Sequence, residues 1–177
     1  IIPNSVTKIG YNAFYGCGRL CNKLMIPDSV TKIGEYAFYF CGGFNGTLIL
    51  SKNILNINCY SFAYCTNFIG SLIIPNSVLA IDYNAFYGCH GFNGTLKLSN
   101  SLKYIGEKAF YECSNFIGSL VIPNSVIQIN SEAFYCCHKF NGCLNLSNSL
   151  TIINHETFYK CYDFKGSLII PNSVTKI

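Results

Sequence analysis

Ala109-Phe110-Tyr111-Glu112-Cys113 recurs in near-copies at a constant spacing along the whole chain, and this recurrence decides the fold. A phenylalanine returns every 24 residues, and a cysteine follows three residues after each one. A spacing that never slips predicts one structural unit stacked on copies of itself, because each unit buries against its neighbours the apolar face that it cannot bury alone. The two columns are Phe14, Phe38, Phe62, Phe86, Phe110, Phe134 and Phe158, and Cys17, Cys41, Cys65, Cys89, Cys113, Cys137 and Cys161.

Two aliphatic columns predict short strands. The first is isoleucine throughout, and the second is leucine followed two residues later by isoleucine or leucine. Apolar residues at i and i+2 have strand periodicity, so we expect a short strand over residues 71–74 and its equivalents, and a second one over residues 6–9 on the opposite wall. The columns are Ile9, Ile33, Ile57, Ile81, Ile105, Ile129, Ile153 and Ile177, and Leu24, Leu48, Leu72, Leu96, Leu120, Leu144 and Leu168.

One strand per repeat predicts a parallel sheet that rises ~4.8 Å per coil, so seven repeats extend roughly 34 Å. A glycine column before the strands predicts a tight turn with positive φ. The Ala-Phe-Tyr-x-Cys stretch is expected to close each coil as a single helical turn with Phe and Cys inward. The glycines are Gly46, Gly70, Gly94, Gly118, Gly142 and Gly166.

The rows also alternate. Ile-Pro follows the strand in every second row and Leu-Ser follows it in the others, which indicates a 48-residue unit of duplication. Residues 1–177 make seven full repeats and a partial one, and residues 1–9 are identical to residues 169–177. Because solenoids normally end in atypical repeats, and neither end is atypical, we expect a segment of a longer array.

Composition excludes several classes of protein. Half of the 177 residues are hydrophobic and 11% are charged, which is unlike a disordered chain. No apolar run approaches the roughly 18–20 residues that cross a bilayer. The net charge of +4 is scattered singly, without the basic cluster that nucleic acid binding requires.

The cysteines are interpreted mainly as buried free thiols. Disulfides are the alternative, but side chains on neighbouring rungs of a parallel ladder stay ~4.8 Å apart, beyond the ~3.8 Å between Cβ atoms that a bridge prefers. Each ladder thiol is expected to act as a small hydrophobe and weak donor to the adjoining coil. The redox state of the four cysteines outside the ladder stays open; these are Cys21, Cys59, Cys136 and Cys143.

Candidate chemistry is sparse. Cys136-Cys137-His138 lacks a second Cys/His pair at zinc-ligand spacing, and Cys137 belongs to the core column. No histidine stands in a pattern with a nucleophile and an orienting acid, and the glutamates at the turn fit a solvated face. We therefore expect no enzymatic activity, no metal and no cofactor.

One surface column lies on the predicted strands and points outward. A mostly apolar stripe on an open sheet face is typical of a binding surface. The alternative, given nearly equal weight, is lateral packing of β-branched residues that stabilises the sheet. The residues are Met25, Ile49, Ile73, Lys97, Val121, Asn145 and Ile169.

A second surface column follows the buried phenylalanine and consists of tyrosine, with Ala63 as its gap. Tyrosine supplies amphipathic contact area at interfaces, which suits adhesion. Ring stacking between successive repeats is the simpler explanation and the one we favour. The residues are Tyr15, Tyr39, Tyr87, Tyr111, Tyr135 and Tyr159.

Asn45, Asn93 and Asn145 begin Asn-x-Ser/Thr sequons. They accept glycans only if the chain passes through a secretory route. Asn45 and Asn93 are the candidates, whereas Asn145 lies on a predicted strand. Asn-Gly is also an ordinary turn pair, so the sequons alone leave glycosylation open.

The row Leu-x-Ile-Pro-x-Ser-Val-x-x-Ile-Gly-x-x-Ala-Phe-x-x-Cys, as in residues 24–41, resembles the BspA-like, treponemal-type leucine-rich repeats over the whole chain. The resemblance implies a mainly β, right-handed leucine-rich-repeat solenoid. It also implies a non-enzymatic cell-surface or extracellular adhesion protein that binds proteins or matrix. The alternative is a cytoplasmic scaffold built into a larger complex, with self-association along or beside the array.

Overall fold

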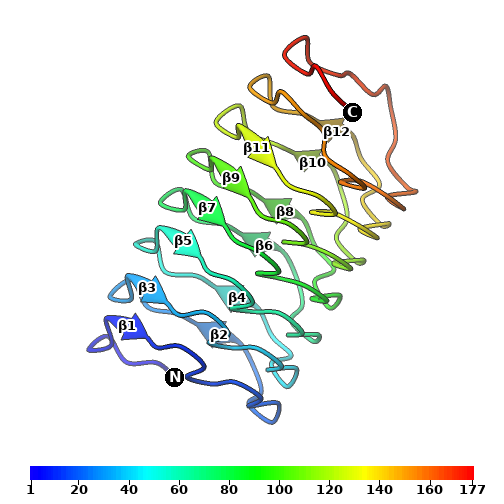
Figure 1. Cartoon of the computed structure of the whole chain (residues 1–177). Helices are drawn as coiled ribbons and strands as arrows, with labels where there is room; N and C mark the ends of the chain where they lie inside the picture. Colours follow the sequence, from blue (N-terminus) through cyan, green and yellow to red (C-terminus); the bar gives the residue numbers. More distant parts are fainter.

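The computed structural model describes all 177 residues as a stack of coils that rises regularly from the N-terminus to the C-terminus (Figure 1). Each coil runs through a strand wall, a tight turn, an opposite wall and a longer turn edge. The strand wall contains β2 (Leu24–Met25), β4 (Leu48–Ile49), β6 (Leu72–Ile73), β8 (Leu96–Lys97), β10 (Leu120–Val121) and β12 (Leu144–Asn145). The opposite wall contains β1 (Lys8–Ile9), β3 (Lys32–Ile33), β5 (Asn56–Ile57), β7 (Ala80–Ile81), β9 (Tyr104–Ile105) and β11 (Gln128–Ile129).

All strand pairs are parallel and in the register that the 24-residue spacing predicts. In the strand wall Leu24 aligns with Leu48, and in the opposite wall Ile57 aligns with Ile81. The inward residue of each strand is buried, apart from half-buried Leu144 in β12, and the outward residue lies at or near the surface. The expected mainly β repeat solenoid is therefore confirmed.

The core between the walls is a set of continuous ladders. Phe62 and Phe86 stack with their ring centroids 5.4 Å apart and their planes 7° from parallel, and the other members of this column stack in the same way. A second phenylalanine ladder, beyond the one that the opening motif predicts, runs from Phe44 to Phe164 and includes Phe68, Phe92, Phe116 and Phe140. Stacked rings of this kind combine apolar burial with favourable aromatic geometry.

The expected single helical turn at Ala-Phe-Tyr-x-Cys was wrong. The stretch is a run of β-turns, in which the Ala109 N–H bonds to the Gly106 carbonyl oxygen and the Cys113 N–H to the Phe110 carbonyl oxygen. Lys108 and Glu112 have φ near +55°. The physical reason is competition: the N–H groups of alternate residues donate to the next coil, as Phe110 does to the Ala133 carbonyl oxygen at 2.8 Å, so they are not available to a helix.

The strand wall is not one continuous sheet, which corrects the expectation of one paired strand per repeat. It consists of three pairs, β2–β4, β6–β8 and β10–β12, with breaks between β4 and β6 and between β8 and β10. Leu168 lies one coil after β12, at the place where the alternation predicts another break, and no strand forms there. The opposite wall pairs β5, β7, β9 and β11 without a break, whereas β1 and β3 form a separate pair.

The glycine column explains the breaks. Gly70 has φ +79° and forms the expected turn, whereas Gly46 has no positive φ and instead permits close contact between coils. A Cβ on Gly46 would lie 2.7 Å from the Lys23 nitrogen. The coil that carries β4 is therefore drawn against the coil that carries β2, and the wall opens on its other side. The 48-residue alternation thus corresponds to tightly paired coils.

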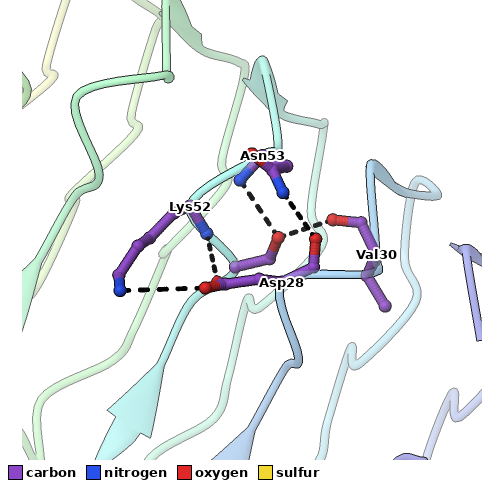
Figure 2. Close-up of polar contacts among 5 residues, drawn as sticks. Asp28, Val30, Lys52 and Asn53 are labelled. Carbon is purple, nitrogen blue, oxygen red and sulfur yellow. Dashed lines mark hydrogen bonds and ion pairs between the residues drawn. The ribbon is translucent and has the colours of Figure 1, made fainter. Parts of the chain in front are cut away.

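The tight turn that joins the walls is held by side chains that bridge coils (Figure 2). Buried Ser51 donates to the Val30 carbonyl oxygen and accepts the Asn53 N–H. Asp28 Oδ1 accepts the Lys52 N–H at 2.9 Å. These bonds satisfy turn backbone groups that the short strands leave without partners.

Candidate functional site

The outward column of the strand wall is exposed along its whole length. Ile49 is 42% exposed and Ile73 58% exposed, although both belong to strands whose other residue is buried. All seven residues predicted for this surface lie on it; Lys97 and Asn145 are its two polar members among Met25, Ile49, Ile73, Val121 and Ile169. The stripe is therefore a low-charge apolar surface on an open sheet face.

A groove of about 690 Å³ lies on this wall at the break between β4 and β6. Ile49, Ile73 and Pro75 provide its apolar lining, and the hydroxyl-bearing side chains of Thr47 and Ser71 lie beside them. A groove of this size is within the ~300–1,000 Å³ that small-molecule and side-chain pockets occupy.

Backbone groups add polar character to the groove. The N–H groups of Leu48 and Leu50 alternate with the N–H of Ile49 along the strand and therefore face β6, where no backbone acceptor meets them. Their buried side chains leave only their backbone atoms to line the groove. Apolar contacts and unpaired donors on one strand edge are the features by which sheets bind extended segments.

A charged pair borders the groove on the side of the tight turn. Lys52 Nζ lies 3.7 Å from Asp28 Oδ2, and both side chains are largely exposed (Figure 2). Asp28 is also held by the Lys52 N–H, so the carboxylate is fixed while the lysine side chain extends into solvent. Exposed pairs of this kind contribute little to stability, and Lys52 is free to contact a ligand.

The predicted tyrosine column forms a partly exposed ladder on the turn edge. Tyr87 and Tyr111 stack at 4.7 Å and 4°, and Tyr111 and Tyr135 at 4.5 Å and 5°. Tyr15 and Tyr39 also stack, and Tyr135 and Tyr159 are tilted by 30°. The favoured explanation, stacking between repeats, agrees with this geometry.

Ala63 breaks the tyrosine column, and Tyr64 from the next position replaces the missing ring. Tyr64 meets Tyr39 edge-on at 5.6 Å and Tyr87 at an interplanar angle of 53°. Its own parallel partner is Phe40, at 4.6 Å. Position 64 was not a predicted surface residue; the alanine in an otherwise aromatic column was the signal.

The candidate acceptor residues for glycans, Asn45 and Asn93, are exposed and hold neighbouring coils together. Asn45 Oδ1 accepts the Asn22 N–H at 2.9 Å, and Asn93 Oδ1 accepts the Gly70 N–H at 2.8 Å. The side-chain nitrogens, to which a glycan would be attached, are not used in these bonds. Asn145 lies on β12 with its side chain exposed.

The ladder cysteines occupy the role predicted for them. Cys65 Sγ donates to the Phe38 carbonyl oxygen at 3.0 Å, and the same bond recurs from Cys41 to Cys161. Burial raises the pKa of the Cys89 thiol well above its ordinary value, so this thiol stays protonated and unreactive. Cys136 and His138 are both half-buried, and no group of three or more His, Cys, Asp or Glu side chains lies close enough to hold a metal ion.

Comparisons with known proteins agree with this geometry. A family model described as BspA type leucine rich repeat region matches six copies, over residues 1–93 and 68–177. No curated protein matches the chain. The structure contains no helix of the length and hydropathy needed to span a membrane.

Two solved structures are similar. A leucine-rich repeat protein of T. pallidum is 26% identical over 90% of this chain and 61% of its own length, with a TM-score of 0.60. A leucine-rich repeat protein of Bacteroides ovatus is 25% identical over 96% of this chain and 48% of its own, with a TM-score of 0.68. The chain thus spans between about half and three fifths of the length of these two proteins.

Proposed function

The chain belongs to the BspA-type leucine-rich repeat family, and from this we propose that it is a non-enzymatic binding protein of the cell surface or extracellular space. The family supports a role in protein interaction, and a leucine-rich solenoid is a fold typical of binding rather than catalysis. The strand wall is the proposed binding surface, and its partner is a protein or a matrix component.

The groove between β4 and β6 is the single observation that carries this proposal. Ile49 and Ile73 offer apolar contacts, and the unpaired N–H groups of Leu48 and Leu50 offer donors to a partner's carbonyl oxygens. An extended peptide segment combines both complements, because its side chains alternate while its backbone carries regularly spaced acceptors. The apolar stripe continues to Val121, so a longer partner would gain contacts from several coils.

Substitution on the wall tests the surface. Replacing Ile49, Ile73 and Val121 together by Lys places three positive charges on the stripe, and burying them against a partner costs desolvation free energy. We therefore expect the affinity for the partner to fall by at least about tenfold. The matched control replaces Leu55, Leu79 and Ile127 by Lys, since these exposed aliphatic residues lie outside the strand wall. Circular dichroism checks that both variants fold. Unchanged affinity in the first variant would remove the strand wall from the proposal.

The location is tested separately. Asn45 and Asn93 are exposed sequon residues, so they are accessible to glycosylation in a chain that passes through a secretory route. Intact-mass measurement on protein from its native source is expected to find a glycan at one of them. A wholly unmodified mass would favour the cytoplasmic scaffold instead.

A further inference from the structure

A second cavity lies on the turn edge, outside the strand wall. It has a volume of about 360 Å³ and is lined by Tyr60, Tyr64, Tyr87, Asn84 and Glu132 among others. It lies close to the interruption of the tyrosine column. Its lining is unlike that of the apolar groove, because nearly every side chain carries a hydroxyl, amide or charged group.

The cavity forms where large side chains are replaced by small ones. Tyr60 stacks in parallel on Tyr36 of the preceding coil at 4.6 Å, but the same position in the next coil is Asn84. Tyr64 stacks on Phe40, but the next coil has Gly88 there. No ring stacks in parallel on the other side of Tyr60 or Tyr64. Instead Tyr83 meets Tyr60 edge-on at 5.3 Å and Tyr87 meets Tyr64 at a tilt of 53°, and the cavity occupies the space that remains beside them.

Asn84 provides a polar group without a partner. Its side chain lines the cavity and is only 3% exposed, yet its Oδ1 atom is buried and accepts no hydrogen bond from the chain. Because buried polar groups are almost always hydrogen-bonded, this oxygen indicates that a ligand with its own donors completes the site.

The phenol groups of the cavity are neutral donors and acceptors. Burial is the main cause that raises the pKa of Tyr60 and Tyr87 well above the ordinary value for tyrosine. Burial also raises the pKa of Tyr111 to about 12. These hydroxyls therefore keep their protons throughout the physiological range and present both a donor and an acceptor.

The charges at the edge of the cavity cancel. Lys108 Nζ lies 3.4 Å from Glu132 Oε1, and both residues line the cavity. A cationic ligand would meet the lysine, and an anionic one the carboxylate. An apolar peptide would leave the hydroxyls and Asn84 Oδ1 unpaired, at a desolvation cost for each. The remaining class is neutral and rich in hydroxyl groups.

We propose that this cavity binds a small neutral carbohydrate of one or two sugar rings. The partly exposed rings of Tyr60 and Tyr64 offer apolar contact to the C–H groups of a sugar, while the tyrosine hydroxyls and the Asn84 side chain pair with its hydroxyl groups. A cavity of about 360 Å³ is at the small end of ligand sites, which limits the ligand to this size. The site is independent of the strand wall and of the function proposed for it.

The test uses the whole chain and saturation-transfer NMR with glucose, galactose and N-acetylglucosamine at millimolar concentration. We expect saturation of at least one sugar by the unmodified chain. Asn84→Tyr continues the aromatic stack, fills the cavity and should abolish the signal. This change is compatible with the fold, since Tyr36 and Tyr60 occupy the same position with the same positive φ. Tyr64→Phe keeps the ring, removes one hydroxyl and should weaken binding about fivefold.

Asn12→Tyr is the matched control, because Asn12 holds the same position at φ 55° in a coil outside the cavity. It should leave sugar binding unchanged. Absence of saturation for every sugar overturns the proposal, as does a signal that survives Asn84→Tyr in a folded variant. Choline and a decaproline peptide serve as competing probes. Binding of either one in place of the sugars would assign the cavity to a cation or to a proline-rich peptide and refute the carbohydrate.

Discussion

The thiol of Cys113 donates a hydrogen bond to the carbonyl oxygen of Phe86, 3.1 Å away in the preceding coil. Cys113 is 1% exposed, and the Phe86 ring stacks on the Phe110 ring at 5.4 Å. The cysteine therefore joins neighbouring coils in two ways, by filling space beside the aromatic ladder and by donating a second hydrogen bond to a carbonyl oxygen that also accepts the Cys89 N–H.

Cys113→Ala should lower the free energy of unfolding by about 1–2 kcal/mol, because it removes a buried sulfur and one of the two hydrogen bonds that the Phe86 carbonyl oxygen accepts. Urea denaturation followed by circular dichroism measures the change. Cys143→Ala is the control, since Cys143 is exposed and lies outside the ladder; we expect a change within about 0.5 kcal/mol. Equal effects of the two substitutions would contradict the structural role of the thiol.

Stability should fall in alkaline solution. Burial raises the pKa of Cys41 from 9.0 to about 11 and that of Cys161 to about 12. Above about pH 9 the unfolded chain loses these thiol protons while the folded chain keeps them, so the folded state binds more protons and the free energy of unfolding falls as pH rises. The fall continues until the folded thiols ionise, near pH 11 for Cys41.

Urea denaturation between about pH 8 and pH 11 measures this dependence. The double variant Cys41→Ala, Cys161→Ala removes two of the contributing thiols and should show a shallower fall than the unmodified chain. The remainder comes from the other ladder thiols and from the tyrosines, whose pKa values burial also raises. An identical slope in both chains would mean that Cys41 and Cys161 do not contribute to the loss of stability in alkali.

Much of the fold can be predicted from the constant spacing alone. Ile33 and Phe38 are buried because every coil places these columns inward, and an interval of 24 residues sets the strand register. The turn conformation was not predictable in the same way. Phe and Cys at i and i+3 suit a helical turn equally well, and only the bonds from alternate N–H groups to the next coil exclude it.

The candidate surfaces divide similarly. Alternation along a strand places Ile49 and Ile73 outward, and this part was predictable. The groove between them depends on how closely Gly46 lets one coil approach another. This distance between coils cannot be read from the spacing of residues in the sequence. The turn-edge cavity had a sequence signal, since Asn84 and Gly88 replace large aromatic residues, but the buried unpaired oxygen of Asn84 appears only in three dimensions.

The contacts of Asp28 predict which part of its interaction with Lys52 matters. Lys52→Ala removes only an exposed ion pair and should change the free energy of unfolding by less than about 0.5 kcal/mol. Asp28→Ala removes the acceptor of the Lys52 N–H and should cost about 1 kcal/mol. Asp28→Asn should be close to neutral, because Asn76 and Asn124 accept the equivalent bond two and four coils later. Thermal denaturation of the three variants ranks them, and a larger loss for Lys52→Ala than for Asp28→Ala would reverse the assignment.

Backbone strain at Glu112 predicts a stabilising substitution. Glu112 is exposed with φ 57°, whereas Gly16 and Gly88 occupy the same position in other coils. The left-handed conformation costs a residue with a Cβ about 1–2 kcal/mol, and glycine avoids this cost. The greater conformational entropy of glycine in the unfolded chain offsets only part of the gain. Glu112→Gly should therefore raise the free energy of unfolding by about 0.5–1 kcal/mol in urea denaturation. Glu35→Gly is the matched control: Glu35 is an exposed glutamate of the same turn edge with ordinary φ, and its replacement should destabilise. If both glycine substitutions destabilise the chain equally, the positive φ of Glu112 does not cost the folded state free energy.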